Sequence, residues 1–307
     1  MAPLVSIITV NFRKAGITCD FLDSLKQATY PNYELLLVDN GMIEDEQARF
    51  AAHHSQVKLV KSTENLGFAG GNNLAIRQAR GKYLLLINND TLVPPEFLEP
   101  MVAVMEADEQ VGLVSPKIYY HDQPNMLQYA GQGYIEMRTG RGRDTAKHTI
   151  DEGQFAAQVE AAFAHGACML IRAEVLEEIG LLREDYFMYY EELDFSVRAR
   201  QAGWKIMYTP DAYIHHRESS SMGKFSPLKT YYMFRNRWLF VRRFGSWLDR
   251  LAFALYFLII GIPVNLLRFA LKREWLHVEA IWNGLVWNLR YWNKKAKTPQ
   301  LKHIDAV

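Results

Sequence analysis

Short apolar runs alternate with longer amphipathic segments along the first part of the chain. The runs are apolar almost throughout, which indicates strands buried on both faces, and they occupy residues 4–10, 33–39, 57–60 and 83–88. Segments with a helical pattern lie near residues 15–28, 44–54, 69–80 and 95–107. Such alternation predicts an α/β fold with a mainly parallel central sheet flanked by helices.

The pattern continues less regularly after residue 110. Apolar runs at residues 111–119 and 166–171 add strands, and the polar stretch 121–153 predicts irregular hairpins or a mobile loop over a pocket. The remaining elements expected before residue 217 are helices at 173–179 and 191–202, the latter ending at Gly203, and short strands at 205–208 and 212–216.

Polar side chains stand at the carboxyl ends of the predicted strands. The first strand ends at Asn11, the second at Asp39, and the fourth runs into residues 88–90, Asn-Asn-Asp. Because ligands of parallel α/β sheets bind outside the carboxyl ends of the strands, these residues predict one shared pocket.

The chain after His216 differs in net charge and in composition from the part before it. Residues 1–216 hold 19 Lys and Arg against 29 Asp and Glu, a balance of −10, whereas residues 217–307 hold 16 against 5, a balance of +11. We therefore expect an α/β domain over residues 1–225 and a helical, basic and aromatic region over 226–307 that associates with an anionic membrane surface. Nucleic acid is the rival partner for a basic tail, and the apolar stretches within this tail favour the membrane.

The longest uncharged stretch of the tail covers the 17 residues 251–267. It is shorter than the roughly 20 residues that span a bilayer comfortably, and Gly261 and Pro263 interrupt it, so an interfacial or re-entrant anchor is expected. A buried helical hairpin or an oligomer contact would account for the same pattern. The first residues lack a secretory signal, and Cys19 and Cys168 lie far apart, so we expect a cytoplasmic location without a disulfide framework or structural zinc site.

Several segments resemble the motifs of one enzyme family. They are SIITVNF (6–12), VDNG (38–41), NLGFAGGNN (65–73) with LINNDT (86–91), and HGACMLIR (165–172) followed by YFMYYEELDFSVRARQAGW (186–204). In this order and spacing they resemble the inverting family 2 glycosyltransferases with a GT-A fold, in particular the bacterial rhamnosyltransferase-like members, over roughly residues 4–240.

The resemblance implies a metal-dependent enzyme at the cytoplasmic face of the bacterial inner membrane. Such an enzyme moves a sugar from a nucleotide-diphosphate donor to a hydroxyl of a lipid-linked or cell-envelope glycan. The likeness favours L-rhamnose from dTDP-L-rhamnose, with UDP-sugars as the next class of donor.

Strand ends and glycines supply the expected donor site. In the family the Asp matching Asp39 contacts the nucleobase, and the alternative is a helix cap or turn. The Gly-rich segment 65–73 combines close backbone approach with a helix N-terminus that favours phosphate, and it matches neither the GxGxxG fingerprint nor a Walker loop. The residues expected to bind the nucleotide sugar are Asn11, Asp39, Asn65, Gly67, Asn72 and Asn89.

The Asn-Asn-Asp segment 88–90 occupies the place of the family's DxD motif, with Asp90 where the family has a metal ligand. One carboxylate suffices for Mg2+ or Mn2+ when a diphosphate completes the shell. His216 resembles a family His that joins the metal site, and the adjacent His215 leaves the register open. The alternatives are a polar turn and ordinary hydrogen-bonded histidines.

Three carboxylates, Glu191, Glu192 and Asp194, open a predicted helix and resemble the family's ED motif, whose second acidic residue is the general base. Glu192 matches that position, but the family more often has Asp there, so Glu191 and Asp194 stay open as alternatives. The helix dipole favours acidic residues in a first turn and explains one of the three without a catalytic role. The preceding aromatic run, residues 186–190, suits either a core or a stacking wall for sugar rings.

Two other functions fit parts of the pattern. A sugar-phosphate nucleotidyltransferase also binds nucleotide on an α/β sheet, but it would have a Gly-rich loop with Arg and Lys after the first strand, where this chain has NFRKA (11–15). A membrane-bound scaffold that kept the fold and lost turnover would have no need for Asp39, Asp90 and the acidic pair.

Overall fold

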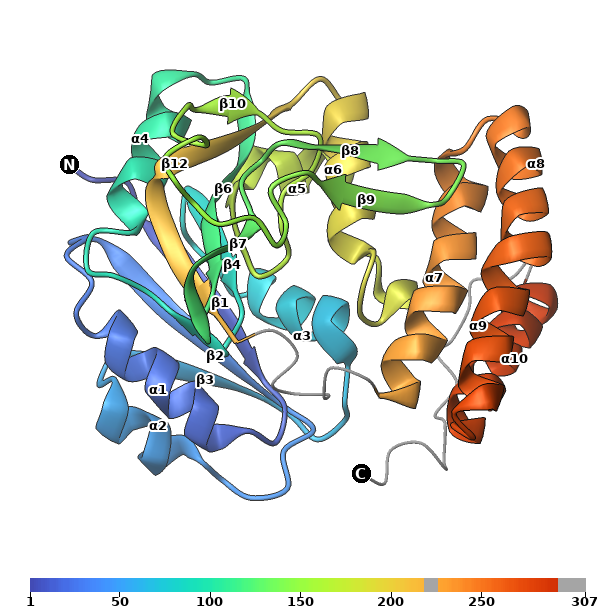
Figure 1. Cartoon of the computed structure of the whole chain (residues 1–307). Helices are drawn as coiled ribbons and strands as arrows, with labels where there is room; N and C mark the ends of the chain where they lie inside the picture. The colour runs from blue at the N-terminus through green and yellow to red at the C-terminus, as the bar shows by residue number, and fades with distance from the viewer. Residues whose placement is uncertain (218–225, 292–307) are drawn as a thin grey trace.

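The structure, a computed structural model, describes residues 1–217 and 226–291 of the chain. Up to residue 120 the elements are β1 (Val5–Asn11), α1 (Ala15–Leu25), β2 (Tyr33–Asn40), α2 (Gln47–His53), β3 (Val57–Ser62), α3 (Gly67–Ile76), β4 (Tyr83–Ile87), β5 (Thr91–Leu92), α4 (Leu98–Ala107) and β6 (Val111–Tyr120). Strands β3, β2, β1 and β4 lie side by side in this order and all pair in parallel (Figure 1). The predicted parallel sheet is confirmed.

The second half of the sheet is mixed. Its elements are β7 (Gln123–Tyr129), β8 (Gly133–Glu136), β9 (Arg141–Asp144), β10 (Val159–Glu160), β11 (Cys168–Arg172), α5 (Ala173–Ile179), the 3-10 turn η1 (Glu184–Tyr186), α6 (Glu191–Gln201) and β12 (Lys205–His216). Strand β11 lies antiparallel between β4 and β6, and β12 runs parallel to β6 on its other side.

One expectation for this half needs correction, and one alternative left open is decided. Residues 205–216 form one strand rather than two, because β12 keeps pairing with β6 across a register shift between Thr209 and Tyr213, where Pro210 cannot donate to a ladder. The polar stretch after β6 forms antiparallel pairs: β7 pairs with β6, and β8 pairs with β9 in a separate hairpin. The hairpin alternative was therefore the right one.

The tail is a group of helices beside the sheet. They are α7 (Pro227–Phe244), α8 (Trp247–Tyr256), the π-helical turn η2 (Phe257–Gly261), α9 (Ile262–Leu271) and α10 (Trp275–Arg290). Ser226 caps α7, and Ser246 with Asp249 forms a capping box at α8. In Figure 1 the tail helices stand together on one side of the molecule, and the β8–β9 hairpin extends toward α7.

The apolar stretch of the tail is longer than its uncharged core. Helices α8, η2 and α9 join into one helix of 25 residues over Trp247–Leu271, whose most apolar 18-residue window has a mean hydropathy of 1.9 and is 22% buried. The expected break at Gly261 and Pro263 was wrong, because a π-helical turn absorbs the change in hydrogen bonding and Pro263 falls in the first turn of α9. By length and composition alone this helix could cross a membrane.

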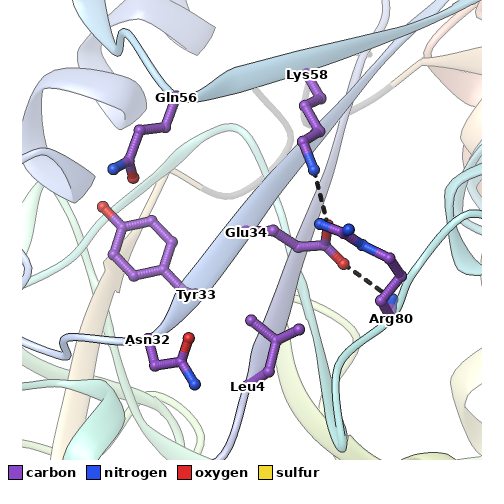
Figure 2. A pocket seen from close by; sticks show the side chains of 7 residues that line it. All are labelled: Leu4, Asn32, Tyr33, Glu34, Gln56, Lys58 and Arg80. Atoms are coloured by element: carbon purple, nitrogen blue, oxygen red, sulfur yellow. Dashed lines mark hydrogen bonds and ion pairs between the residues drawn. The ribbon is translucent and has the colours of Figure 1, made fainter.

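The amino ends of the parallel strands carry a pocket of about 450 Å³, the amino-end pocket, lined by Leu4, Asn32, Tyr33, Glu34, Gln56, Lys58 and Arg80. Figure 2 shows the Glu34 carboxylate between Lys58 and Arg80. It accepts hydrogen bonds from Ser6 Oγ at 2.7 Å, from the Arg80 amide at 2.8 Å, and from Lys58 Nζ at 3.0 Å. Burial would raise the pKa of Glu34, but these hydrogen bonds prevail and lower it to about 2.

Candidate active site

A chain of hydrogen bonds joins the carboxyl ends of β1, β2 and β4. Asn11 and Asp39 are register partners, and Asn11 Nδ2 donates to Asp39 Oδ1 at 2.9 Å. Asn11 Oδ1 accepts from Thr18 Oγ1 at 2.9 Å, and Thr18 Oγ1 accepts from Asn89 Nδ2 at 2.7 Å. Three of the predicted site residues are therefore held together, and Thr18 on α1, which connects them, has no signal in the sequence.

Beside this network lies a second pocket of about 520 Å³, the carboxyl-end pocket. It is lined by Asn11, Arg13, Lys14, Ala15, Gly16, Ile17, Asp39, Gly41, Met42, Ile43, Glu44, Glu46 and Arg49. Asp39 Oδ2 is buried and has no hydrogen-bond partner. Burial raises the pKa of Asp39, and the hydrogen bond from Asn11 opposes this shift. A carboxylate oxygen left in this state suits a ligand that donates a hydrogen bond, such as a nucleobase or a ribose hydroxyl.

The Gly-rich segment contacts the turn that precedes α6. Gly67 has φ +69°, and a Cβ there would lie 2.4 Å from the carbonyl oxygen of Phe187. That oxygen accepts from the amides of Phe68 at 2.7 Å and Ala69 at 3.2 Å, the first amides of α3. Asn65 Oδ1 accepts from the Gly67 amide, and Asn72 Nδ2 donates to Phe68 O. The helix end expected to bind phosphate thus uses three of its amides, those of residues 67–69, within the protein.

Asp90 and His216 lie together at the junction of β5 and β12. Asp90 Oδ1 is 3.1 Å from His216 Nε2 and, although buried, has no hydrogen-bond partner. His216 Nδ1 lies 2.8 Å from Gln128 Oε1, which can only accept, so Nδ1 donates to that oxygen and Nε2 is the ring nitrogen that faces Asp90. Asn88 Nδ2 lies 3.2 Å from the same Nε2. His215 instead stacks on Tyr119, with ring centroids 5.5 Å apart.

This pair fits a divalent cation. A buried carboxylate oxygen without a partner and an imidazole nitrogen whose tautomer is fixed through its other nitrogen are typical metal ligands. Within residues 1–217 and 226–291, no group of three or more His, Cys, Asp or Glu side chains is placed to hold a metal. Asp90 and His216 would therefore need oxygen atoms of a bound ligand, such as a diphosphate, to complete the shell.

Residues 165 and 166 connect the acidic start of α6 to this pair. A Cβ on Gly166 would be 3.6 Å from Glu192 Cγ, and the neighbouring His165 packs on His216 with ring centroids 6.4 Å apart. Burial raises the pKa of Glu191 and of Glu192, and the charge of Glu192 raises the pKa of Glu191 further. Oε2 of both residues is buried without a hydrogen-bond partner.

Asp194 differs from the two glutamates. It is fully buried, and its two oxygens accept from Arg198 Nε and Arg243 Nε, both at 2.7 Å. Both oxygens are thus engaged by guanidinium groups, one on α6 itself and one on α7 of the tail. Glu191 and Glu192 have the free acceptor oxygens at this end of the helix.

Comparison with known proteins gives the family of the chain. Residues 6–180, more than half of the chain, match Glycosyl transferase family 2. A low-salt glycan biosynthesis hexosyltransferase of Haloferax volcanii is 26% identical over 92% of this chain and 90% of its own length. An N-acetylglucosaminyl-diphospho-decaprenol L-rhamnosyltransferase of Mycobacterium tuberculosis is 22% identical over 73% and 79%. The chain spans only 25% of an uncharacterized Sinorhizobium fredii protein to which it is 28% identical.

The fold also matches solved structures. A mannosyltransferase from Pyrobaculum calidifontis, solved with GDP-Man and Mn2+, superposes with a TM-score of 0.59 at 18% identity, covering 97% of this chain and 77% of that one. The expected GT-A fold is confirmed. With a family match over residues 6–180 and this fold, the chain belongs to glycosyl transferase family 2.

Proposed function

We propose that this glycosyltransferase moves L-rhamnose from dTDP-L-rhamnose, with inversion, to a hydroxyl of a lipid-linked or cell-envelope glycan. The observation that carries the proposal is that, in the part of the chain that the structure describes, four of the five carboxylates with a buried oxygen that accepts no hydrogen bond, Asp39, Asp90, Glu191 and Glu192, are candidate site residues; the fifth is Glu99 on α4. Burying such oxygens costs free energy unless a ligand supplies the missing partners. The name of the Mycobacterium tuberculosis relative supports the choice of sugar and of a lipid-linked acceptor.

Glu192 is the general base in this proposal. Its side chain is partly exposed, whereas Glu191 is 4% exposed, so an acceptor hydroxyl can reach Glu192 more readily. Inversion requires one carboxylate that takes the hydroxyl proton while the oxygen attacks the anomeric carbon opposite the leaving group. Asp194, with both oxygens bound by arginines, fixes α6 to α7 instead.

Asp90 and His216 would hold the divalent metal, Mg2+ or Mn2+. Bound there with the diphosphate, such a cation neutralises charge on the departing nucleotide. Gln128 Oε1 accepts from His216 Nδ1, so Nε2, the nitrogen that faces Asp90, is the one left to bind the metal. Asn11 and Asp39 bind the nucleobase or ribose. Asn89 donates to Thr18, which donates to Asn11, and Asn89 therefore helps to hold the Asn11 side chain against Asp39.

The tail places the enzyme on the cytoplasmic face of the membrane in this proposal. Of the 19 large hydrophobic side chains exposed in the described residues, 14 lie between Trp247 and Leu289. So large an exposed apolar face is typical of a membrane or protein contact. The balance of +11 after His216 adds attraction to anionic lipid of about 1 kcal/mol for each Lys or Arg near the surface.

The donor is tested by a thermal-shift panel of dTDP-rhamnose, UDP-sugars and GDP-sugars with and without Mn2+. A ligand that binds only the folded state raises the melting temperature. We expect the largest rise with dTDP-rhamnose and Mn2+ together. A rise confined to another nucleotide sugar reassigns the donor, and no rise with any of them contradicts the enzyme proposal in favour of an inactive scaffold.

The membrane contact is tested with vesicles. The full chain should bind anionic vesicles at low salt, leave them only partly at high salt, and need detergent for full release, because apolar burial is insensitive to salt. Leu255→Asp with Ile259→Asp on the exposed face should lower the affinity, since each charge would enter the hydrocarbon. A chain that does not bind anionic vesicles at low salt would place an oligomer interface on this face instead.

A further inference from the structure

The turn that precedes α6 has an unusual backbone. Phe187, Tyr189 and Tyr190 have φ values of +66°, +65° and +79°, although none of them is glycine. A bulky side chain in this left-handed region costs on the order of 1 kcal/mol or more for each residue. Glu191 and Glu192 follow at once, so the strained turn sets where their side chains start. Such a conformation persists only where its surroundings hold it.

Two buried residues of α7 hold this turn by its carbonyl oxygens. Arg235 Nη2 donates to Asp185 O at 2.5 Å and to Tyr186 O at 2.6 Å. Asn236 Nδ2 lies within hydrogen-bond distance of the same Tyr186 O at 3.0 Å and of two more acceptors, Met188 O at 2.8 Å and Tyr189 O at 2.7 Å. Both side chains are fully buried.

The two side chains are themselves held in place. Arg235 Nε donates to Asn236 Oδ1 at 2.7 Å, which fixes the amide so that its nitrogen faces the turn. The Arg235 guanidinium lies over the rings of Tyr232 and Trp287, 4.7 Å and 4.4 Å from their centroids. Trp287 belongs to α10, so the last described helix covers the group that holds the turn.

Further contacts tie the same region to α7 and to the sheet. Arg237 Nε donates to the hydroxyl of Tyr190, which donates to Gly140 O of the β8–β9 connection. On the opposite side, Phe187 O accepts the first amides of α3. The turn therefore lies between α3, on the donor side of the site, and α7 of the tail. The carbonyl oxygens of residues 185–189 accept hydrogen bonds from these two helices.

We propose that Arg235 and Asn236 are positioning residues that hold the turn 186–190 in its left-handed conformation and so place the Glu192 carboxylate for transfer. This inference rests on the proposed function of Glu192. It gives the tail a role beside membrane contact: α7 completes the catalytic end of the sheet, and α10 protects the contact. A displacement of about 1 Å at a reacting group can cost roughly 100-fold in rate.

The experiment measures Asn236→Ala in the full chain with Mn2+. Turnover is followed as hydrolysis of dTDP-rhamnose, or of whichever nucleotide sugar the thermal-shift panel selects, and binding as calorimetry with the matching nucleoside diphosphate. We expect kcat to fall about 100-fold with KM and nucleotide affinity within about twofold, because only the base has moved. Asn265→Ala removes a half-buried amide that donates to Gly261 O in the apolar helix rather than to the turn or to α7, and it should keep wild-type turnover.

A glycine in the turn supplies the specific rescue. A glycine at position 189 adopts a positive φ without strain, so adding Tyr189→Gly to Asn236→Ala should restore turnover at least partly. The same glycine would not restore turnover if Asn236→Ala had caused a general packing defect. If Asn236→Ala does not fold, Arg235→Lys is measured instead, since it keeps the charge but lacks the planar fork; the same loss of kcat is expected.

The outcomes separate the two proposals. Wild-type turnover in Asn236→Ala, beside a Glu192→Gln variant that is inactive, overturns the positioning role alone. Parallel loss of nucleotide affinity and turnover, without rescue by Tyr189→Gly, also overturns it. Full turnover in both Glu192→Gln and Glu191→Gln overturns the proposed base and this inference with it.

Discussion

Glu34 and Asp39 are both buried on strand β2, one near each end, and their surroundings are opposite. The Glu34 carboxylate accepts hydrogen bonds from Ser6, Lys58 and Arg80, and its pKa is lowered to about 2. Asp39 has one hydrogen bond, from Asn11, an unpartnered oxygen, and a raised pKa caused first by burial. Both oxygens of the carboxylate at one end of the strand accept hydrogen bonds, and the carboxylate at the other end keeps one oxygen without a hydrogen-bond partner.

Pocket size does not distinguish these two ends. The amino-end and carboxyl-end pockets measure about 450 Å³ and about 520 Å³. What differs is whether the polar groups in and around them are already satisfied. Asp90, Glu191 and Glu192 repeat the unsatisfied state of Asp39. Buried carboxylate oxygens without hydrogen-bond partners therefore distinguish the two ends of this sheet better than its cavities do, although Glu99 on α4 has such an oxygen too.

The largest effect should come from Glu192→Gln. Removing the base should lower turnover by about 100-fold or more, while the affinity for nucleoside diphosphate changes little, because the amide keeps the size of the side chain. Steady-state kinetics and calorimetry measure the two quantities. Near-normal turnover here together with an inactive Asp194→Asn would move the role to Asp194.

Asp90→Ala should remove the metal dependence of binding. Without this carboxylate, Mn2+ should no longer strengthen the binding of nucleoside diphosphate, and transfer should be lost with it. Calorimetry with and without Mn2+ gives the comparison. An unchanged Mn2+ effect would sink the assignment of Asp90 as principal ligand.

Matched neutral substitutions at the two ends of β2 should have opposite effects. Asp39→Asn removes a costly buried charge, so the melting temperature should rise while nucleotide affinity falls about tenfold. Glu34→Gln should lower the free energy of unfolding by about 1–3 kcal/mol and leave nucleotide affinity unchanged. Urea unfolding and calorimetry measure both; equal effects on stability would contradict the contrast between the ends.

As the pH is lowered, turnover should fall before the stabilising contribution of Glu34 is lost. The folded pKa of Glu34, about 2, lies below its ordinary value of 4.5, so its contribution to stability is complete above pH 4.5 and is lost as the pH falls from 4.5 toward 2. The pKa of Glu192 is raised above 4.5 by burial, so turnover should fall at a higher pH, before the loss at Glu34 begins. An acidic limb of kcat/KM at or below pH 4.5 would contradict this order.

Local pattern was enough to predict much of the fold. The apolar runs of β1, β2 and β4 are buried throughout because helices cover the sheet, so periodicity and strand ends placed Asn11, Asp39 and Asp90 at one edge. The pairing of Gln128 with His216, 88 residues apart, and of Asn236 with Met188, 48 apart, depends on tertiary packing that no local pattern records.

The sequence predicted the environment of the tail arginines less well, because that environment also depends on tertiary packing. Arg235 and Arg237 counted as surface charge in the sequence, yet they are 0% and 6% exposed and bind the turn before α6. Composition cannot tell a buried cation with partners from a solvated one. The proposed boundary at residue 225 thus divides membrane contact from catalysis less cleanly than charge alone suggested.

The apolar helix Trp247–Leu271 has a geometric consequence for the acceptor. Helices α7 and α10 pack against it, and α7 in turn binds the turn that carries Glu192. If its exposed face lies in lipid, the packed helices fix the height of Glu192 above the hydrocarbon. A lipid-linked acceptor would then react only when its hydroxyl reaches that height. The distance between the hydrocarbon and Glu192 would therefore select acceptors by the number of sugar and phosphate groups between the lipid and the hydroxyl.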